Sequence, residues 1–302
     1  MSDEGVIETV ELTKRFGRET AVAALNLTVK AHQITGFLGR NGAGKSTTIK
    51  MLLGMTRPTT GSATVLGYRI DNERDSCSIR RHVAYVAEDK PLYGYMTVAE
   101  LIRFTRSFYE DWRRDAEQRL LLQYNLPLDR KVKALSKGMR TKLALLLALA
   151  RRPRLLILDE PSEGLDPVSI EELLQSMVVA ASEGTTVFFS SHQIAEVERI
   201  ADRVCIVDRG RVVTDVALDR LRENYRRITA GFPVAAPTGV LPVLGVEQMR
   251  VSGRQITVLA SQGADQIAEH LRSLGAVSID VEPATLREVF LETVQGAAGA
   301  VA

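Results

Sequence analysis

The sequence contains few cysteines and no long apolar run. Only two of the 302 residues are cysteine, and Cys77 and Cys205 lie far apart in no CxxC or Cys/His cluster. This excludes a disulfide framework and a cysteine-based zinc motif, and it favours two reduced thiols in a cytosolic protein. The longest apolar stretch, residues 143–150, is far shorter than the ~20 residues of a membrane-spanning helix. We therefore expect no direct membrane span.

An excess of charge of one sign is also absent. The chain has 39 basic and 37 acidic residues, a net charge of +2, which gives no global field for attracting nucleic acid or an anionic membrane. We therefore predict no nucleic-acid partner. Residues 1–5 (Met-Ser-Asp-Glu-Gly) are acidic where a signal peptide needs a basic segment. The composition, 45% hydrophobic and 25% charged, is that of a globular protein, and the length favours about two domains.

The first two thirds of the chain alternates short apolar runs with stretches of helical periodicity. Strands are predicted at 6–12, 24–29, 34–38, 155–158, 185–190 and 204–207. Helices are predicted at about 45–54, 98–110, 113–125 and 136–151, and from Ser169 and Gln193. Buried strands that alternate with helices indicate a mainly parallel sheet covered on both faces. We predict an α/β domain over residues 1–216, with a helical insert subdomain at about 90–151.

The composition changes after about residue 216, where glycine and proline interrupt the chain. We predict a small α/β accessory region over residues 217–302. Its elements are predicted as strands at 245–252, 255–260 and 276–281 and helices at 264–274 and from Thr285. The tail from Gly296, rich in alanine and glycine, is expected to fray.

The strongest motif lies between a predicted strand and a predicted helix. It matches G-x-x-x-x-G-K-S, and its residues are Gly39, Arg40, Asn41, Gly42, Ala43, Gly44, Lys45, Ser46 and Thr47. Glycines allow successive amides to curl around phosphate oxygens, and the helix N-terminus adds partial positive charge. Lys45 is placed to reach the β and γ phosphates, and the Ser46 hydroxyl is placed to ligate Mg²⁺. The motif therefore predicts the P-loop of an NTPase.

A second motif is the apolar strand 155–158, which ends in the paired acids Asp159 and Glu160. Asp159 at the end of the strand can hold Mg²⁺ through water, and Glu160 is placed to polarise an attacking water. The alternative is that both acids only cap the strand and carry surface charge. The P-loop earlier in the chain favours the catalytic interpretation.

Three further segments narrow this prediction to one family. Residues 135–139 (Leu-Ser-Lys-Gly-Met) open a predicted helix, residues 162–166 (Ser-Glu-Gly-Leu-Asp) follow the paired acids, and residues 190–192 (Ser-Ser-His) end the next strand. In this order they resemble the signature sequence, D-loop and switch histidine of the ATP-binding cassette family. The resemblance covers residues 6 to about 215. It implies a P-loop NTPase core and a dimer in which each ATP lies between the P-loop of one subunit and the signature of the other.

The resemblance also implies roles for single residues. Phe16 would stack on adenine and His192 would sense the γ phosphate, although each alone would be interpreted as a core or strand-end residue. Glu88 occupies the Q-loop position. The implied catalytic residues are Glu160, His192 and Glu88, and the implied Mg²⁺ ligands are Ser46, Glu88 and Asp159. The signature and D-loop residues that would bind ATP are Ser136, Lys137, Gly138 and Asp166.

The chain departs from the family pattern at three positions. Lys137 stands where the signature usually has glycine, Met139 where it has glutamine, and Glu88 where the Q-loop has glutamine. These variants resemble cassette ATPases that serve bacterial ABC-2-type exporters. That resemblance implies ATP hydrolysis with Mg²⁺ in the cytoplasm, peripheral to the cell membrane, beside a separately encoded transmembrane permease. Both half-sites look complete in one chain, so a homodimer of ATPase subunits is favoured.

The helical insert is rich in arginine and aromatic residues. The default interpretation of the arginines at 103, 106, 113, 114 and 119 is a solvated helical face. In the family, this insert receives a short coupling helix of the membrane subunit. Exposed aromatic side chains such as Trp112 would suit such docking.

Two other functions compete with an exporter ATPase. The first is a cassette ATPase that never meets a membrane, as in translation, DNA repair or chromosome maintenance. This chain lacks the second cassette, the zinc cysteines and the long heptad coils of those classes. The second is a small-molecule kinase on the same P-loop, which leaves the signature and D-loop unexplained.

Overall fold

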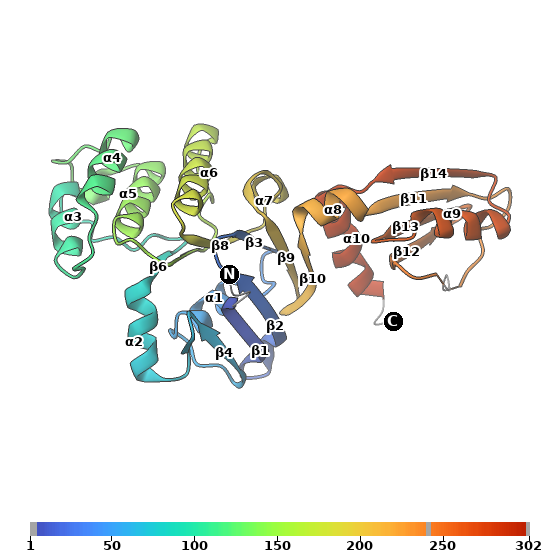
Figure 1. Cartoon of the computed structure of the whole chain (residues 1–302), viewed down its shortest axis with the longest axis horizontal. Coiled ribbons are helices and arrows are strands. Elements are labelled where there is room, and N and C mark those ends of the chain that lie inside the picture. Colours follow the sequence, from blue (N-terminus) through green and yellow to red (C-terminus); the bar gives the residue numbers. More distant parts are fainter. Residues whose placement is uncertain (1–4, 240–242, 300–302) are drawn as a thin grey trace. The chain divides into compact units, whose positions relative to one another are not determined.

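The structure is a computed structural model that describes residues 5–239 and 243–299 (Figure 1). The chain divides into two compact units, Met1–Val212 and Val213–Ala302. Each unit has a sheet and a core of its own, and we describe each by itself.

The first unit is built on a six-stranded sheet in the order β10-β9-β3-β8-β7-β6. The strands are β3 (Ile34–Leu38), β6 (Val83–Val86), β7 (Leu155–Leu158), β8 (Thr186–Ser191), β9 (Arg203–Asp208) and β10 (Arg211–Ala217), which crosses the unit boundary. The pairs β3–β8, β3–β9, β6–β7 and β7–β8 are parallel. The predicted α/β class with a mainly parallel sheet is confirmed, and the carboxyl ends of these strands share one edge.

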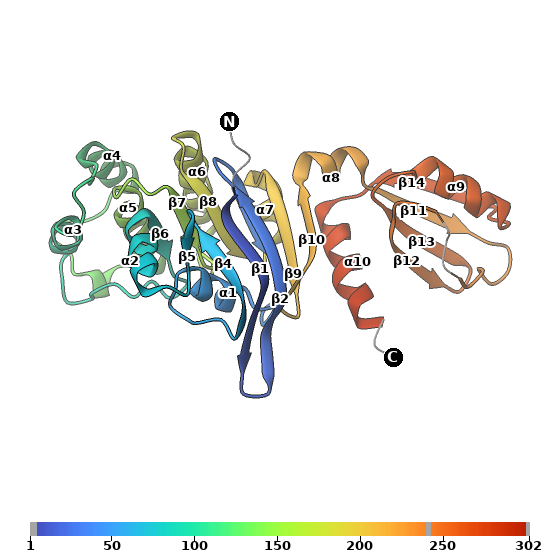
Figure 2. The same ribbon diagram turned by 60° about the horizontal axis from the view of Figure 1, so that its bottom comes forward.

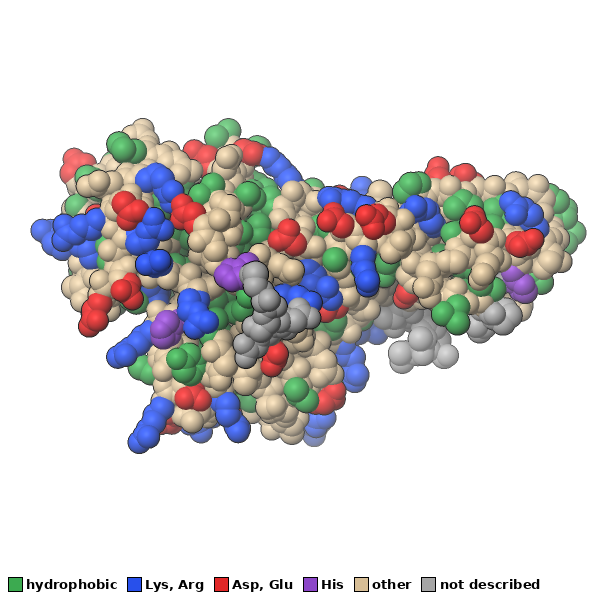
Figure 3. Space-filling model, viewed as in Figure 1, with side chains coloured by type: hydrophobic (Ala, Val, Ile, Leu, Met, Phe, Trp, Pro, Cys, Tyr) green, Lys and Arg blue, Asp and Glu red, His purple; other side chains and the backbone are tan. Residues whose placement is uncertain are grey.

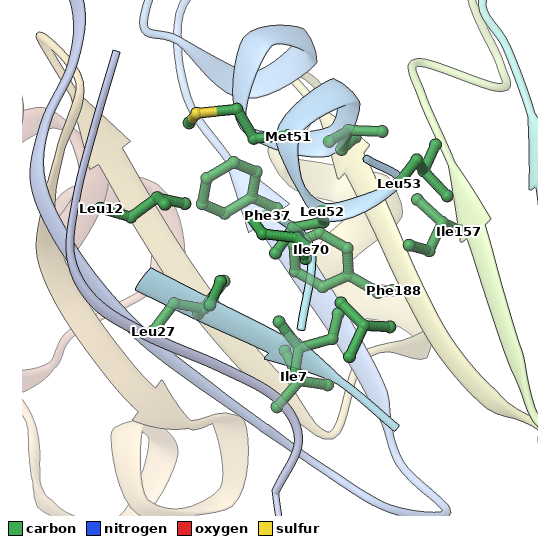
Figure 4. Close-up of a cluster of buried hydrophobic side chains, with 14 of the residues drawn as sticks. Ile7, Leu12, Leu27, Phe37, Met51, Leu52, Leu53, Ile70, Ile157 and Phe188 are labelled. Carbon is green, nitrogen blue, oxygen red and sulfur yellow. The ribbon is translucent and has the colours of Figure 1, made fainter. Parts of the chain in front are cut away.

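A second, antiparallel sheet packs against the first. It has the order β2-β1-β4-β5, with β1 (Gly5–Phe16), β2 (Glu19–Lys30), β4 (Thr60–Val65) and β5 (Tyr68–Arg69). Helix α1 (Lys45–Leu52) lies beside both sheets, and a common apolar core joins all three (Figure 4). In that core, Phe37 and Phe188 lie with their ring centroids 5.3 Å apart, near Ile7 and Met51. Each fully buried side chain of this size contributes ~1.5–3 kcal/mol, so α1 is firmly anchored.

The remaining helices surround the large sheet or form the insert. They are α2 (Glu73–His82), α3 (Val98–Arg106), α4 (Arg114–Tyr124), the short 3₁₀ helix η1 (Val132–Ala134), α5 (Lys137–Leu149), α6 (Pro167–Ser182) and α7 (Ile194–Ile200). Helices α3, α4 and α5 gather at one end of the first unit in both ribbon views (Figures 1 and 2). The predicted capping box begins α3: Glu100 N donates to Thr97 Oγ1 at 3.2 Å, and Thr97 N donates to Glu100 Oε2 at 2.8 Å.

The second unit is an antiparallel sheet with helices. Its elements are α8 (Leu218–Asn224), β11 (Arg226–Gly231), β12 (Val246–Ser252), β13 (Gln255–Ala260), α9 (Ala264–Ser273), β14 (Ser278–Pro283) and α10 (Leu286–Gly299), and the strand order is β12-β13-β11-β14. Ile228 and Val258 of the sheet share a core with Ile267 of α9. Helix α10 continues past Gly296, where fraying was expected, and residues 300–302 lie outside the described part.

The surface carries both signs of charge. On the face in Figure 3, basic and acidic side chains are interspersed over both units.

No helix among the described residues combines the length and apolar character that crossing a bilayer requires.

Candidate active site

The P-loop follows β3 and ends in the first turn of α1. Gly44 precedes α1 with φ 98°, and no side chain caps the helix. A Cβ at Gly44 would lie 2.4 Å from the carbonyl oxygen of Ala21, so only glycine fits. Gly42 also has positive φ, 82°. The first amides of α1 are thus available to an anion, as in other phosphate-binding helix N-termini.

The side chain of Lys45 lies inside the P-loop. It is buried, and Nζ donates to the carbonyl oxygens of Gly39 at 2.7 Å and Arg40 at 3.1 Å. Nζ also forms an ion pair with Glu160 Oε1 at 2.9 Å. The ammonium group is therefore held within the loop and already has a carboxylate as counterion.

The paired acids lie next to the P-loop at the end of β7. Ser46 Oγ donates to Asp159 Oδ1 at 3.1 Å. Ser190 Oγ donates to the same oxygen at 2.7 Å and accepts from Glu160 N at 2.9 Å. Since Leu158 pairs with Phe189 in the parallel ladder, the next residues of both strands lie side by side. The sheet register therefore fixes the two acids, and it gives Ser190 a positioning role that the sequence analysis missed.

Ser46 and Asp159 suit a magnesium ion. A hydroxyl and a carboxylate oxygen already in contact are the hard oxygen donors that Mg²⁺ prefers. Glu88 lines the open cleft beside the P-loop, and its backbone carbonyl oxygen accepts a hydrogen bond from Lys90 Nζ at 2.9 Å. The donor set therefore fits Mg²⁺ at Ser46 and Asp159.

His192 lies on the other side of Glu160 from Lys45. Its Nδ1 is 2.8 Å from Glu160 Oε2, and its backbone N–H donates to the same oxygen at 3.3 Å. Its Nε2 lies 3.7 Å from Glu163 Oε2. Glu160 thus lies between a lysine and a histidine. This placement suits a carboxylate that acts as a general base.

These groups border one open cleft of about 650 Å³. The predicted residues that line it are Phe16, Asn41, Gly42, Gly44, Lys45, Ser46, Thr47, Glu88, Glu160 and His192. Gly39, Arg40 and Ala43 belong to the loop that supports Lys45. Phe16 is 53% exposed at the end of β1, so it is not a core residue. A larger hollow of about 930 Å³ between α4 and α6 contains none of the motif residues.

The signature and D-loop residues lie outside the lining of this cleft. Ser136 caps α5 by accepting from Met139 N, and Asp166 caps α6 by accepting from Ser169 N at 3.0 Å. Ser169 Oγ also donates to Asp166, which holds the pKa of that carboxyl below its ordinary value. A Cβ at Gly138 would lie 2.7 Å from Ser169 Oγ. The signature therefore packs directly on the start of α6.

Lys137, the departure from the family signature, lies beside the D-loop. A Cβ at Gly164 would be 2.6 Å from Lys137 Nζ, which places the ammonium group over the backbone of that glycine. Gly164 also has φ 66°. Within one chain the signature therefore contacts the D-loop at Gly164 and the start of α6 at Ser169.

A buried carboxyl that the sequence analysis missed connects the D-loop to β8. Glu196, near the start of α7, accepts from Ser162 Oγ at 2.8 Å and from Ser191 Oγ at 3.1 Å. Burial raises the pKa of this carboxyl above its ordinary value of 4.5. Only the folded contacts reveal this group, since an acidic residue in a helix otherwise predicts an exposed position.

Replacing Glu196 with glutamine should stabilise the protein more at pH 8 than at pH 5. The folded state holds the Glu196 proton more tightly than the unfolded state, so this group lowers stability as pH rises from 4.5 through the raised pKa. Glutamine keeps an oxygen acceptor without the charge. Melting temperatures of wild type and Glu196→Gln at both pH values test this, with Glu110→Gln as an exposed control. A difference between wild type and variant that is equal at the two pH values would contradict it.

The insert presents a row of exposed aromatic side chains. Successive ring centroids lie 5.9, 5.7 and 5.0 Å apart along Tyr95, Tyr93, Phe104 and Phe108, which we name the aromatic row. Trp112 is not part of it, and its suggested exposure was wrong. It is half-buried and donates through Nε1 to Glu117 Oε2 at 2.5 Å.

Comparisons with known proteins agree with this geometry. Residues 22–163 match the family described as ABC transporter. The bacitracin transport ATP-binding protein BcrA of Bacillus licheniformis is 36% identical over 225 residues, 74% of this chain and 73% of that protein. The ABC transporter ATP-binding protein YtrB of Bacillus subtilis is 27% identical over 95% of this chain and 97% of that protein. A solved ATP-binding subunit of an ABC transporter aligns with a TM-score of 0.65 and 31% identity, over 72% of this chain and 92% of that one.

Proposed function

This chain belongs to the ABC transporter family as an ATP-binding, ATP-hydrolysing subunit, and we propose that it drives export through a separately encoded membrane permease. The observation that supports ATP hydrolysis as the driving reaction is the contact of the P-loop lysine with Glu160, which in turn contacts His192. The relative named for bacitracin transport supports a role in transport. The proposed direction, export, rests on the resemblance of the residues at 88, 137 and 139 to those of exporter ATPases.

In the proposed reaction, Lys45 and the first amides of α1 bind the phosphates, and Phe16 stacks on the adenine. Ser46 and Asp159 would hold Mg²⁺, which neutralises charge on the transferred phosphate. Glu160 takes the proton of the attacking water through Oε2, and His192 orients this oxygen. Glu88 faces the same cleft as a further polar group.

We propose that the working form is a homodimer. Ser136, Lys137, Gly138 and Asp166 do not line the cleft of their own chain, so they remain for the nucleotide of a second subunit. One chain carries both halves of the site, which supports two copies of itself as the dimer. We further propose residues 1–216 as the ATPase domain, with its insert at about 90–151, and residues 217–302 as an accessory region.

The aromatic row is the proposed docking surface for the permease. Tyr95 and Phe108 are 67% and 65% exposed, and solvent-facing aromatic side chains in a group are typical of interface cores. By contrast, three of the five arginines at 103, 106, 113, 114 and 119 form ion pairs, as Arg119 does with Glu183 at 2.6 Å. The subunit would then sit at the cytoplasmic face of the membrane, held by its partner.

Changing both Tyr95 and Phe108 to serine should release the subunit from the permease, because the largest exposed apolar area of the row is lost. Co-purification with the proposed permease measures the effect. Leu122→Ser is the matched control, since Leu122 is 83% exposed on α4 outside the aromatic row. A double variant that is folded in a thermal melt and still co-purifies would rule out this surface.

A further inference from the structure

Three side chains from separate segments converge beside the P-loop. Glu160 follows β7, Glu163 lies in the next turn, and His192 follows β8. One imidazole nitrogen and one oxygen of each carboxylate lie within 4.8 Å of one another. We propose that these side chains form a binding site for a divalent transition-metal ion of the Zn²⁺ class, and that the bound ion stops hydrolysis.

The distances suit such an ion. Zinc bonds of about 2.0–2.2 Å place neighbouring ligands of a tetrahedral site ~3.3 Å apart. Glu160 Oε2 is 2.8 Å from Nδ1 of His192, whereas Glu163 Oε2 is 3.7 Å from the other ring nitrogen, Nε2. An ion binds only one nitrogen of an imidazole, and one ring nitrogen with one oxygen of each carboxylate lies within 4.8 Å of one another. Side-chain rotation has to bring these three atoms from within 4.8 Å to the ~3.3 Å of a tetrahedral site, and the ligand set is then complete.

The three groups are also chemically available. Lys45 pairs with Oε1 of Glu160, which leaves Oε2 facing His192. The side chains of His192 and Glu163 are 35% and 43% exposed, and all three residues line the open cleft, so an ion can enter from solvent. Three protein ligands leave a fourth position for water, as in exchangeable zinc sites.

The donor set separates this ion from magnesium. One imidazole nitrogen with two carboxylates suits Zn²⁺ and Co²⁺, whereas Mg²⁺ demands octahedral oxygen coordination and dehydrates reluctantly. The hydroxyl of Ser46 and the carboxylate of Asp159 offer Mg²⁺ a separate oxygen site. Millimolar Mg²⁺ therefore leaves the Glu160, Glu163 and His192 site open to Zn²⁺.

The inhibition rests on the proposed function. Binding of the ion would occupy Oε2 of Glu160, the oxygen that the proposed reaction uses as base, and would hold His192 in place. The binding itself needs no nucleotide and no hydrolysis, so it is tested separately.

Titration of the nucleotide-free, full-length protein with Co²⁺ tests the site through visible absorbance. We expect one Co²⁺ per wild-type chain with the bands of a four-coordinate ion, at least ~10-fold weaker binding in Glu163→Gln and in His192→Ala, and wild-type binding in Glu110→Gln. Equal affinities for wild type and Glu163→Gln would overturn the site. So would a thiolate-to-cobalt charge-transfer band, which would assign the ion to the exposed Cys77.

A second titration follows Mg²⁺-dependent ATP hydrolysis as Zn²⁺ is added. Each rate is divided by the same variant's rate without Zn²⁺, so a change in basal rate does not enter. We expect Glu163→Gln to need at least ~10-fold more Zn²⁺ for half-inhibition. Full hydrolysis by zinc-loaded wild type would overturn the inhibition. A wild type without any hydrolysis would instead refute the proposed function, while the Co²⁺ titration still decides the metal site.

Discussion

Lys45→Ala should bind ATP about 100-fold more weakly than wild type, or worse. Gly39 and Arg40 hold the ammonium group in the loop. In the proposed complex it donates charge-assisted hydrogen bonds to the β and γ phosphates, and the variant loses these two bonds at ~1.5–3 kcal/mol each. Glu160 would also keep a buried negative charge without its counterion, next to the triphosphate. Calorimetric titration with Mg²⁺-ATP measures the effect.

Two further variants identify the cause. Lys50→Ala removes an exposed lysine from the same helix and should bind ATP as wild type does. Lys45→Ala combined with Glu160→Gln removes the uncompensated carboxylate, so it should recover part of the loss. Unchanged ATP affinity in Lys45→Ala alone would refute the P-loop assignment.

Glu160→Gln should hydrolyse ATP ~10²–10⁴-fold more slowly while still binding it. Glutamine keeps the size and the hydrogen-bonding reach of the side chain but removes its basicity. Lys45 loses a counterion in this variant, so its ammonium group is freer for phosphate and nucleotide affinity should not fall. A phosphate-release assay and calorimetry measure the two quantities.

Slow hydrolysis should also change the assembly of this variant. Two ATP molecules held between two subunits bind only the dimer, so mass action favours it as long as they persist. With Mg²⁺ and ATP, Glu160→Gln should elute as a dimer in size-exclusion chromatography, whereas wild type and Glu110→Gln elute mainly as monomers. Near-normal hydrolysis would remove Glu160 from its role as base, and a monomer with bound ATP would argue against the homodimer.

The elements that hold the motifs could be predicted because they are short and strongly patterned. Ile34–Leu38 and Leu155–Leu158 are buried along their whole length, and both were predicted with the bounds that the structure gives. Helix α2 was missed because it is mostly polar and buries only Ser76 and Ile79, which leaves no apolar periodicity. Strand β11 was missed because Gly231 and the prolines after it indicated a linker.

The residues of the candidate site also fall into two groups, those that could be predicted from the sequence and those that could not. Lys45, Ser46, Asp159 and Glu160 follow from motif spacing, because each is fixed by its distance along the chain from a strand end. The contacts of Ser190 and Glu163 depend on which strands are neighbours, and parallel pairing of β7 with β8 cannot be read from local sequence. The contacts of these residues could therefore be identified only once the order of the strands in the sheet was known.

The packing of Gly138 on Ser169 connects the two ATP sites of the proposed homodimer. Asp166 accepts a hydrogen bond from Ser169 and lies six positions after Glu160. The same short segment therefore carries the proposed base of one site and leads to the residue on which the signature packs. In the proposed homodimer that signature faces the other nucleotide. The free energy of occupying one site then depends on the state of the other, and the two ATP molecules are thermodynamically linked.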